Sequence, residues 1–224
     1  MRTPKYADNV LSNTIAEHIT EQIVSGELEP GEKLVEDNYA KEYGTSRAPV
    51  REAIYILAIE GLVERIPHKG AIVKRYLKTE IYDLLEIRNM LEKMAVDRIK
   101  EHGIDQKLLE EMKEILNRMK AVVHDVRSYT QLNHSFHKCL IKMSKSSTIM
   151  EMYLRLGWPL LRVQNLSFAK TGNIEKSIAE HEKIIELLSK QYMAELSDVL
   201  IKHNEDVISS ITAIIDLQNL SNGN

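Results

Sequence analysis

Three histidines and one asparagine fall on the apolar faces of predicted helices in the second half of the chain. Asn133 and His137 are four residues apart and therefore share one helix face, while His181 and His203 sit between apolar residues of two later helices. Neutral imidazoles bind divalent transition metals, so three of them converging with an amide oxygen would form a metal site. Any one of these histidines alone is more typical of a core residue with a hydrogen-bond partner. Because the three histidines converge, a metal site is favoured over three separate core residues.

Arg88 lies on the apolar face of a helix predicted at 79–102. A buried cation requires an anion. Glu92, one turn later, could supply it in an ordinary i,i+4 pair, or a carboxylate ligand could bind there. Arg162 is a second candidate for the same role. A metal ion, an arginine and a cavity together would suit a small organic acid that binds as a regulatory ligand, or effector.

The segment 46–52 has the composition of a helix that enters a DNA major groove. Arg47 and Arg51 are four residues apart and share a face. Pro49 suits a first helical turn, and the backbone N–H groups of Arg47 and Ala48 remain free for a phosphate. The apolar residues that would bury the opposite face are Val50, Ala53, Ile54 and Leu57.

The charge distribution supports DNA contact in this region. The whole chain carries a net charge of −3, and residues 1–46 carry −5. Residues 47–78 carry +4, so positive charge gathers around the candidate DNA-reading helix and the segment after it. An ordinary solvated surface would show a similar pattern, and charge alone does not distinguish the two.

Length and composition indicate two mainly helical domains. The chain has 224 residues, 43% of them hydrophobic, with two Phe and one Trp. Cys139 is the single cysteine, which fits a reducing cytoplasm. No stretch approaches a membrane span and the N-terminus leads into no apolar signal region, so we expect a soluble cytoplasmic protein without membrane contact.

The positions of Gly and Pro predict where the N-terminal helices and strands begin and end. Two helices flank Gly44, a natural helix terminator, which is the pattern of a helix-turn-helix. A basic β-hairpin, the wing, follows. The predicted elements are a helix at 8–25, a turn at 28–31, a helix at 36–43, the DNA-reading helix opened by residues 45–46, and strands at 62–66 and 71–75.

From Thr79 onward the pattern changes to long helical segments with short breaks, which predicts a helix bundle. Trp158 and Pro159 indicate a kink in one of them. The predicted helices cover 79–102, 105–126, 128–143, 147–168, 174–190 and 192–218.

The segments 28–34, 44–53 and 60–63 resemble the winged helix-turn-helix of GntR-family transcription regulators. The resemblance covers about residues 10–75 and implies that Ser46, Arg47, Ala48 and Arg51 contact DNA. It also implies that the wing tip, His68-Lys69-Gly70, approaches the minor groove. Asp37 stands where some members have a basic residue that touches DNA, so that contact is not expected here.

The C-terminal motif resembles the FCD effector domain of the FadR subgroup. The matching residues are Asn133, His137, Glu180-His181 and His203, and the resemblance implies that they bind a divalent metal. The family usually has Asp at the position of Asn133, and His134 is the alternative ligand. Arg88 to Glu92 resembles the Arg-x-x-Leu-Glu of FCD domains.

These observations predict a mainly α transcription regulator with a winged helix-turn-helix at 1–76 and an FCD-like bundle at 77–224. We expect a homodimeric repressor that binds an inverted-repeat operator in double-stranded DNA. Its affinity would respond to a small carboxylate effector beside a divalent metal, zinc first and nickel as the alternative.

Two rival hypotheses use the same residues differently. A three-histidine metalloenzyme is disfavoured because Ile185 stands where a His-Glu-x-x-His zinc motif needs its second histidine. An architectural DNA binder without an effector would leave the inward histidines and Arg88 unexplained.

Overall fold

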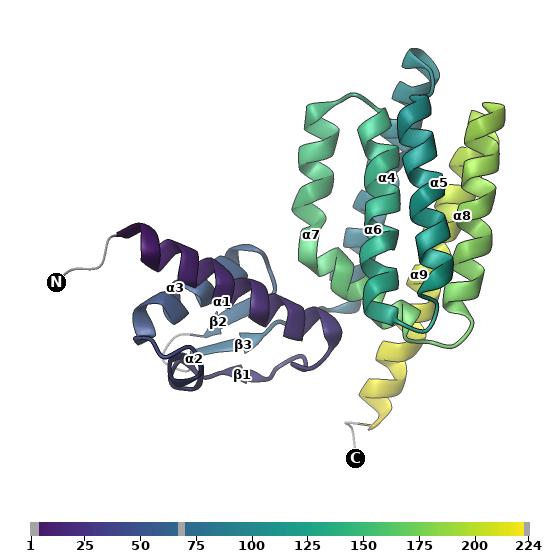
Figure 1. Cartoon of the computed structure of the whole chain (residues 1–224). Helices are drawn as coiled ribbons and strands as arrows, with labels where there is room; N and C mark the ends of the chain where they lie inside the picture. The colour runs from purple at the N-terminus through teal and green to yellow at the C-terminus, as the bar shows by residue number, and fades with distance from the viewer. Residues whose placement is uncertain (1–4, 67–69, 222–224) are drawn as a thin grey trace. The chain divides into compact units, whose positions relative to one another are not determined.

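The computed structural model describes the backbone of residues 5–66 and 70–221 and the side chains of residues 10–66 and 70–212. The chain divides into two compact units, Met1–Tyr76 and Leu77–Asn224. Figure 1 shows helices packed on a small sheet in the first unit and helices alone in the second. The fold is mainly α, as the sequence predicts. No described helix has the length and apolar character that crossing a membrane requires.

The N-terminal unit contains the predicted helix-turn-helix. Its helices are α1 (Lys5–Ser25), α2 (Glu36–Glu42) and α3 (Arg47–Ile59). Gly44 follows α2 with a φ of +58°, a conformation that glycine adopts without steric strain, and this lets the chain turn into α3. α1 packs against α3. The buried apolar side chains of this contact include Ile15, Ile19, Ile23, Val50, Ala53, Ile54 and Leu57.

A three-stranded antiparallel sheet completes this unit. Its strands are β1 (Lys33–Leu34), β2 (Val63–Ile66) and β3 (Gly70–Val73), in the order β1-β3-β2. Strands β2 and β3 form the predicted hairpin, although β3 ends two residues earlier than expected. The sequence did not predict β1, because two residues carry no periodic pattern. By pairing with β3, β1 fixes the backbone directly before α2.

The C-terminal unit is the predicted helix bundle. Its six described helices are α4 (Lys78–His102), α5 (Gln106–Ala121), α6 (Val126–Met143), α7 (Ser147–Phe168), α8 (Asn173–Lys190) and α9 (Met193–Ser221).

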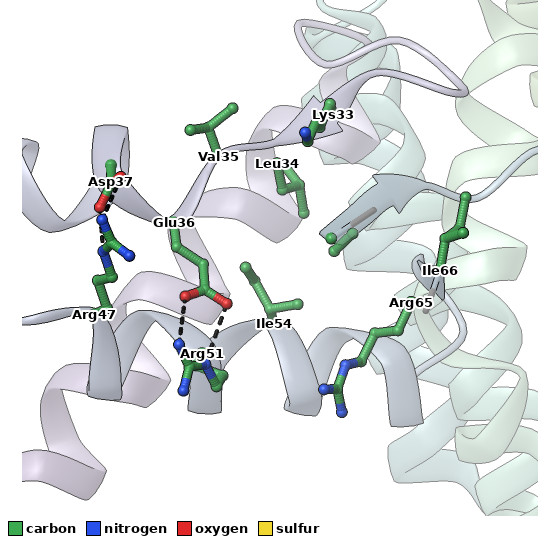
Figure 2. Close-up of a pocket in the computed structure, with 12 residues that line it drawn as sticks. Lys33, Leu34, Val35, Glu36, Asp37, Arg47, Arg51, Ile54, Arg65 and Ile66 are labelled. Atoms are coloured by element: carbon green, nitrogen blue, oxygen red, sulfur yellow. Dashed lines mark hydrogen bonds and ion pairs between the residues drawn. The ribbon is translucent and has the colours of Figure 1, made fainter. Parts of the chain in front are cut away.

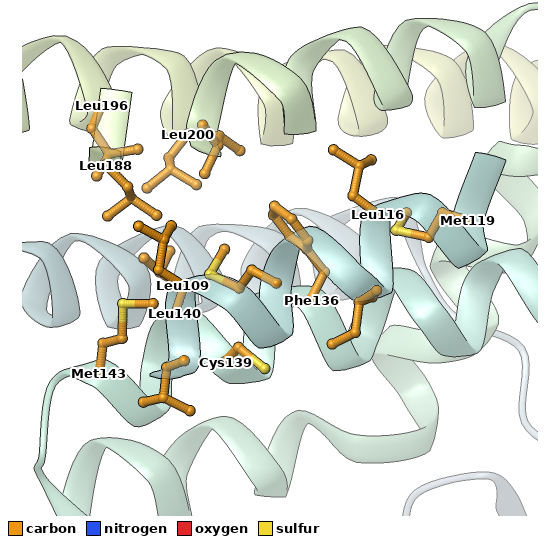
Figure 3. Close-up of a cluster of buried hydrophobic side chains, with 14 of the residues drawn as sticks. Leu109, Leu116, Met119, Phe136, Cys139, Leu140, Met143, Leu188, Leu196 and Leu200 are labelled. Atoms are coloured by element: carbon orange, nitrogen blue, oxygen red, sulfur yellow. The ribbon is translucent and has the colours of Figure 1, made fainter. Parts of the chain in front are cut away.

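Leucine, isoleucine and methionine dominate the core of the bundle (Figure 3). Phe136 of α6 and Met112 of α5 belong to this cluster and are fully buried. Helices α5, α6, α8 and α9 all contribute to this cluster. Tyr129 packs edge-on against Phe168 of α7, with ring centroids 4.8 Å apart. The core therefore packs together the helices that carry the predicted metal-binding histidines.

Two local features of the bundle refine the sequence prediction. Helix α5 ends at Ala121, five residues before the expected end. The Asp125 side chain accepts a hydrogen bond from the backbone N–H of Ser128 and so begins α6 early. The predicted kink is present in α7, at Gly157, where φ is +32°. Pro159 contributes because it cannot donate a hydrogen bond to the carbonyl one turn earlier.

Candidate metal centre and DNA-facing surface

Three buried histidines converge from three helices of the C-terminal unit. His137 belongs to α6, His181 to α8 and His203 to α9, and each is at most 1% exposed. One ring nitrogen from each lies within 4.8 Å of the others. The Nε2 atoms of His137 and His181 are 3.1 Å apart. This cluster has the donor atoms and the spacing to hold a metal ion.

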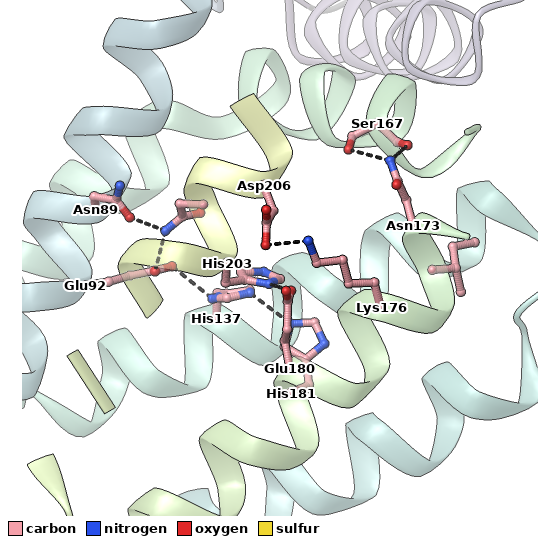
Figure 4. A network of polar contacts seen from close by, with 12 residues as sticks. Asn89, Glu92, His137, Ser167, Asn173, Lys176, Glu180, His181, His203 and Asp206 are labelled. Atoms are coloured by element: carbon pink, nitrogen blue, oxygen red, sulfur yellow. Dashed lines mark hydrogen bonds and ion pairs between the residues drawn. The ribbon is translucent and has the colours of Figure 1, made fainter. Parts of the chain in front are cut away.

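Two carboxylates lie against two of the three imidazoles (Figure 4). Glu92 of α4 places Oε1 2.9 Å from Nδ1 of His137, and Glu180 of α8 places Oε2 2.5 Å from Nδ1 of His203. The Nε2 atoms of these two rings are therefore the ones left for a ligand. Carboxylate support of this kind fixes ring orientation and raises the basicity of a ligating nitrogen.

Burial keeps His137 and His181 in the uncharged form that a metal needs. Burial, together with the nearby charge of Arg88, lowers the pKa of His137 to about 3. Burial likewise holds the pKa of His181 well below its ordinary value. Neutral imidazoles present a lone pair instead of a proton, so the interior selects ligand-competent rings.

Asn133 is fully buried one helical turn before His137. Neither its side-chain oxygen nor its side-chain nitrogen has a hydrogen-bond partner. Buried amides normally find partners, so these unsatisfied atoms fit a residue that faces a ligand. His134, the alternative ligand, instead stacks on Tyr153 with ring centroids 5.3 Å apart.

Arg88 is completely buried, as its position on the apolar stripe of α4 predicts. Its Nε donates to Oε1 of Glu92 at 2.8 Å, while Nη1 and Nη2 have no partner. Burial alone would raise the pKa of the Glu92 carboxyl, but the guanidinium of Arg88 outweighs it and holds that pKa below its usual range. Arg88 therefore pairs with Glu92 and keeps two donors for an anion.

Further polar groups in the bundle interior escaped the sequence analysis. Tyr153 and Gln164 of α7 are fully buried, and neither the tyrosine hydroxyl nor the glutamine amide has a hydrogen-bond partner. Arg162, the second arginine that the sequence predicts for this site, is 3% exposed in the same helix. In the sequence, Glu92 and Glu180 stand out only as neighbours of Arg88 and His181. No local pattern marks them as histidine partners, because that contact joins different helices.

A small hollow of about 40 Å³ is lined by His203, Glu180, Lys176 and Asp206. It is large enough for a water or an ion and too small for an organic acid. Lys176 and Asp206 form an ion pair of 2.6 Å beside it (Figure 4). The hollow therefore reaches one histidine of the cluster, His203.

The described part of the N-terminal unit presents two arginines on the exposed face of α3. Arg47 is 62% exposed and Arg51 is 61% exposed, while the opposite face of the helix is buried. Each arginine pairs with a carboxylate at the start of α2, Arg47 with Asp37 and Arg51 with Glu36 (Figure 2). Ser46 is the N-cap of α3, and Ala48 lies in its first turn.

The wing is described only in part. Gly70 begins β3 with a φ of +95°, whereas His68 and Lys69 lie outside the described residues. Arg65 of β2 lines the same surface hollow as the two arginines of α3.

Comparison with known proteins gives two family matches. Residues 11–73 match the family described as "Bacterial regulatory proteins, gntR family", and residues 83–206 match the FCD domain. The gluconate operon transcriptional repressor of Bacillus subtilis (strain 168) is 27% identical over 205 residues, which cover 86% of this chain and 82% of the repressor. The regulator LutR of the same organism is 25% identical over 211 residues, covering 84% and 96%.

Solved structures share the fold. A GntR regulator from Rhodococcus sp. RHA1 superimposes with a TM-score of 0.75 at 22% identity, covering 90% of this chain and 97% of that one. Escherichia coli McbR/YncC gives a TM-score of 0.73 at 21% identity, covering 93% and 98%.

Proposed function

The chain belongs to the GntR family of bacterial regulatory proteins and carries an FCD domain, so it is a DNA-binding transcription regulator, and we propose that a small carboxylate effector controls its DNA affinity. The effector would bind beside a divalent metal in the C-terminal unit. We further propose that the protein is a repressor, in line with its likeness to the gluconate operon repressor of Bacillus subtilis. The metalloenzyme alternative loses support, because the related proteins are regulators.

The proposed metal ligands are His137, His181 and His203, with Asn133 or a water completing the shell. The support is the burial of the three rings, their mutual distances, and the uncharged state that burial favours for His137 and His181. Zinc is the first candidate and nickel the second, since imidazole ligands suit both. When bound, the metal would act as a Lewis acid toward a carboxylate oxygen.

Arg88 is the proposed anchor for the effector carboxylate, with Arg162 as the second. Arg88 carries two buried, unpaired nitrogens, and a carboxylate has two oxygens that match a guanidinium edge. The unpaired Tyr153 hydroxyl and Gln164 amide offer further polar contacts to hydroxyl or carbonyl groups on the same ligand.

DNA contact is proposed for Ser46, Arg47, Ala48 and Arg51 at the start of α3, with the wing tip residues His68, Lys69 and Gly70 in the minor groove. The exposure of both arginines supports this surface. The first backbone N–H groups of a helix have no intrahelical partner, so α3 can also hold a phosphate.

A homodimer on an inverted-repeat operator is proposed because one small winged unit makes few base contacts, and a two-fold pair doubles them. An exposed apolar stripe supports the assembly. Ile87, Met90 and Met94 on α4 are 45%, 55% and 49% exposed, and Met152 on the neighbouring α7 is 42% exposed. Several large apolar side chains exposed along one helix are typical of a contact with another chain.

One observation carries the proposal: the buried histidine cluster, together with the two unpaired nitrogens of the buried Arg88. The test is elemental analysis and native mass spectrometry of the purified protein, followed by DNA titration with and without any copurified carboxylate. A regulator will change its DNA affinity and return the carboxylate unaltered. Consumption of the carboxylate would favour the metalloenzyme.

A further inference from the structure

Two consecutive carboxylates at the start of α2 each hold one arginine of α3. Nε and Nη2 of Arg51 donate to the two oxygens of Glu36 at 3.2 and 2.9 Å. Arg47 uses the same pair of atoms: Nη2 donates to Oδ2 of Asp37 at 2.7 Å, and Nε contacts Oδ1. Figure 2 shows both pairs along one side of the surface hollow. We call this arrangement the carboxylate clamp, formed by Glu36 and Asp37.

The clamp is built into the fold. Leu34 of β1 is buried and paired with Ala71, which anchors the chain just before Glu36. Tyr39 and Ala40 are buried on the inner face of α2, and the two acidic residues of its first turn face the arginines of α3. Acidic side chains in a first helical turn also interact favourably with the helix dipole.

Both ion pairs occupy the same edge of the guanidinium. A guanidinium has five N–H donors, and the edge formed by Nε and Nη2 is taken in each case. The edge formed by Nη1 and Nη2 remains for a second partner. That edge presents two parallel donors, which is the geometry that a guanine O6/N7 pair accepts. Binding to a base therefore does not require the clamp to open.

The clamp also reduces the sequence-independent part of DNA binding. Each carboxylate neutralises most of the field of its arginine at long range and repels phosphates. Phosphate attraction depends on net charge, whereas base recognition depends on donor geometry. Neutralising an arginine without changing its orientation therefore weakens the protein's binding to random DNA more than its binding to the preferred site.

From this geometry we propose that Glu36 and Asp37 are specificity-determining positioning residues for DNA recognition, orienting Arg51 and Arg47 toward base edges and suppressing binding to random sequence. The inference rests on the proposed DNA contacts of the two arginines. It concerns carboxylates that contact the arginines, and it does not require a carboxylate to contact DNA itself.

The experiment begins with selection of a preferred duplex from a random-sequence duplex library by the wild-type protein. Affinity is then measured by fluorescence anisotropy for that duplex and for a scrambled duplex of equal composition, over a salt series. The variants are Glu36→Gln, Asp37→Asn, Glu36→Asp and Arg51→Ala. Glu52→Gln is the matched control, because Glu52 is an exposed carboxylate of α3 for which no contact with either arginine is described.

We expect Glu36→Gln and Asp37→Asn to bind the scrambled duplex more tightly while gaining little on the selected one, so that the specificity ratio falls by up to about fivefold. The salt slope on the scrambled duplex should steepen by roughly 0.9 for each arginine released. Glu36→Asp retains the charge but shortens the reach, so it should lower the ratio without changing the salt slope. Glu52→Gln should leave the ratio unchanged.

Several outcomes would overturn the inference. One is an equal gain on both duplexes for Glu36→Gln, which would mean simple repulsion without positioning. Another is a loss of discrimination at base pairs other than those affected by Arg51→Ala, which would mean that Glu36 contacts a base directly. If Arg51→Ala leaves both affinities unchanged, the proposed DNA surface itself is wrong, and this result is distinct from failure of the clamp.

Discussion

The Nε2 atoms of His137 and His181 lie 3.1 Å apart in the interior of the C-terminal unit. Two neutral imidazoles at this distance can share one proton in a hydrogen bond, or both can turn their lone pairs to a cation between them. Nδ1 of His137 already faces Glu92, and Nδ1 of His203 faces Glu180, which directs the remaining nitrogens inward. The arrangement is therefore prepared for a shared ligand.

The first prediction is that His203→Ala loses bound metal and the stability that metal provides. An ion that binds only the folded state stabilises it by about 2.7 kcal/mol when free metal is a hundredfold above its dissociation constant. Chelator should lower the melting temperature of the wild type and leave that of His203→Ala unchanged. His124→Ala, an exposed histidine outside the cluster, is the control and should behave as wild type. If neither protein retains zinc or nickel after reconstitution, the histidines are core residues.

The second prediction separates the structural and ligand-binding roles of Arg88. Replacing Arg88 alone with Met leaves Glu92 buried without its cation and should cost about 3–5 kcal/mol of unfolding free energy. The double variant Arg88→Met with Glu92→Gln removes both charges and should recover much of that stability. It should nevertheless show no thermal shift with a panel of small mono- and dicarboxylates that stabilise the wild type. A retained shift would show that the effector does not use Arg88.

The third prediction concerns DNA affinity. Arg51→Ala should weaken binding to a selected duplex by about 1–3 kcal/mol, because it removes the two donors available to a guanine. Arg118→Ala removes the same charge from an exposed position of α5 and should have little effect. Gel-shift titration at fixed salt measures both, with circular dichroism to verify folding. Unchanged affinity for folded Arg51→Ala contradicts the assignment.

The fourth prediction is that the apolar stripe of α4 mediates dimerisation. Met90→Glu places a charge in the middle of Ile87, Met90 and Met94 and should shift the protein toward monomer, because a buried unpaired charge is costly. Ile201→Glu alters an exposed apolar residue of α9 and should leave assembly unchanged. Sedimentation velocity at micromolar concentration distinguishes the two. A wild type that is already monomeric would refute the dimer.

The fifth prediction is a loss of stability at alkaline pH through Tyr39. Burial, aided by Glu42, raises the pKa of Tyr39 from 10.0 to about 12. The unfolded chain therefore loses this proton first, so the contribution of Tyr39 is complete below pH 10 and declines as the pH rises toward 12. Across that window the unfolding free energy of the wild type should fall, relative to that of Tyr39→Phe, by on the order of 2 kcal/mol.

The sequence by itself determined the helices, the turn at Gly44 and the burial of the histidines. These features follow from local rules, because helical period fixes which side chains share a face and glycine fixes where a helix can end. His137, His181 and His203 each occupy the buried face that their own helix predicts. Arg88 is buried for the same reason.

Only the tertiary structure decided which side chains meet. The contacts of Glu92 with His137 and of Glu36 with Arg51 join separate helices, and strand β1 exists only because β3 lies beside it. Each depends on how elements pack and on the distance between them, which periodicity along one element does not encode. The sequence therefore predicts which single residues can bind a metal or DNA. Which partners orient those residues is decided only when the helices pack against one another.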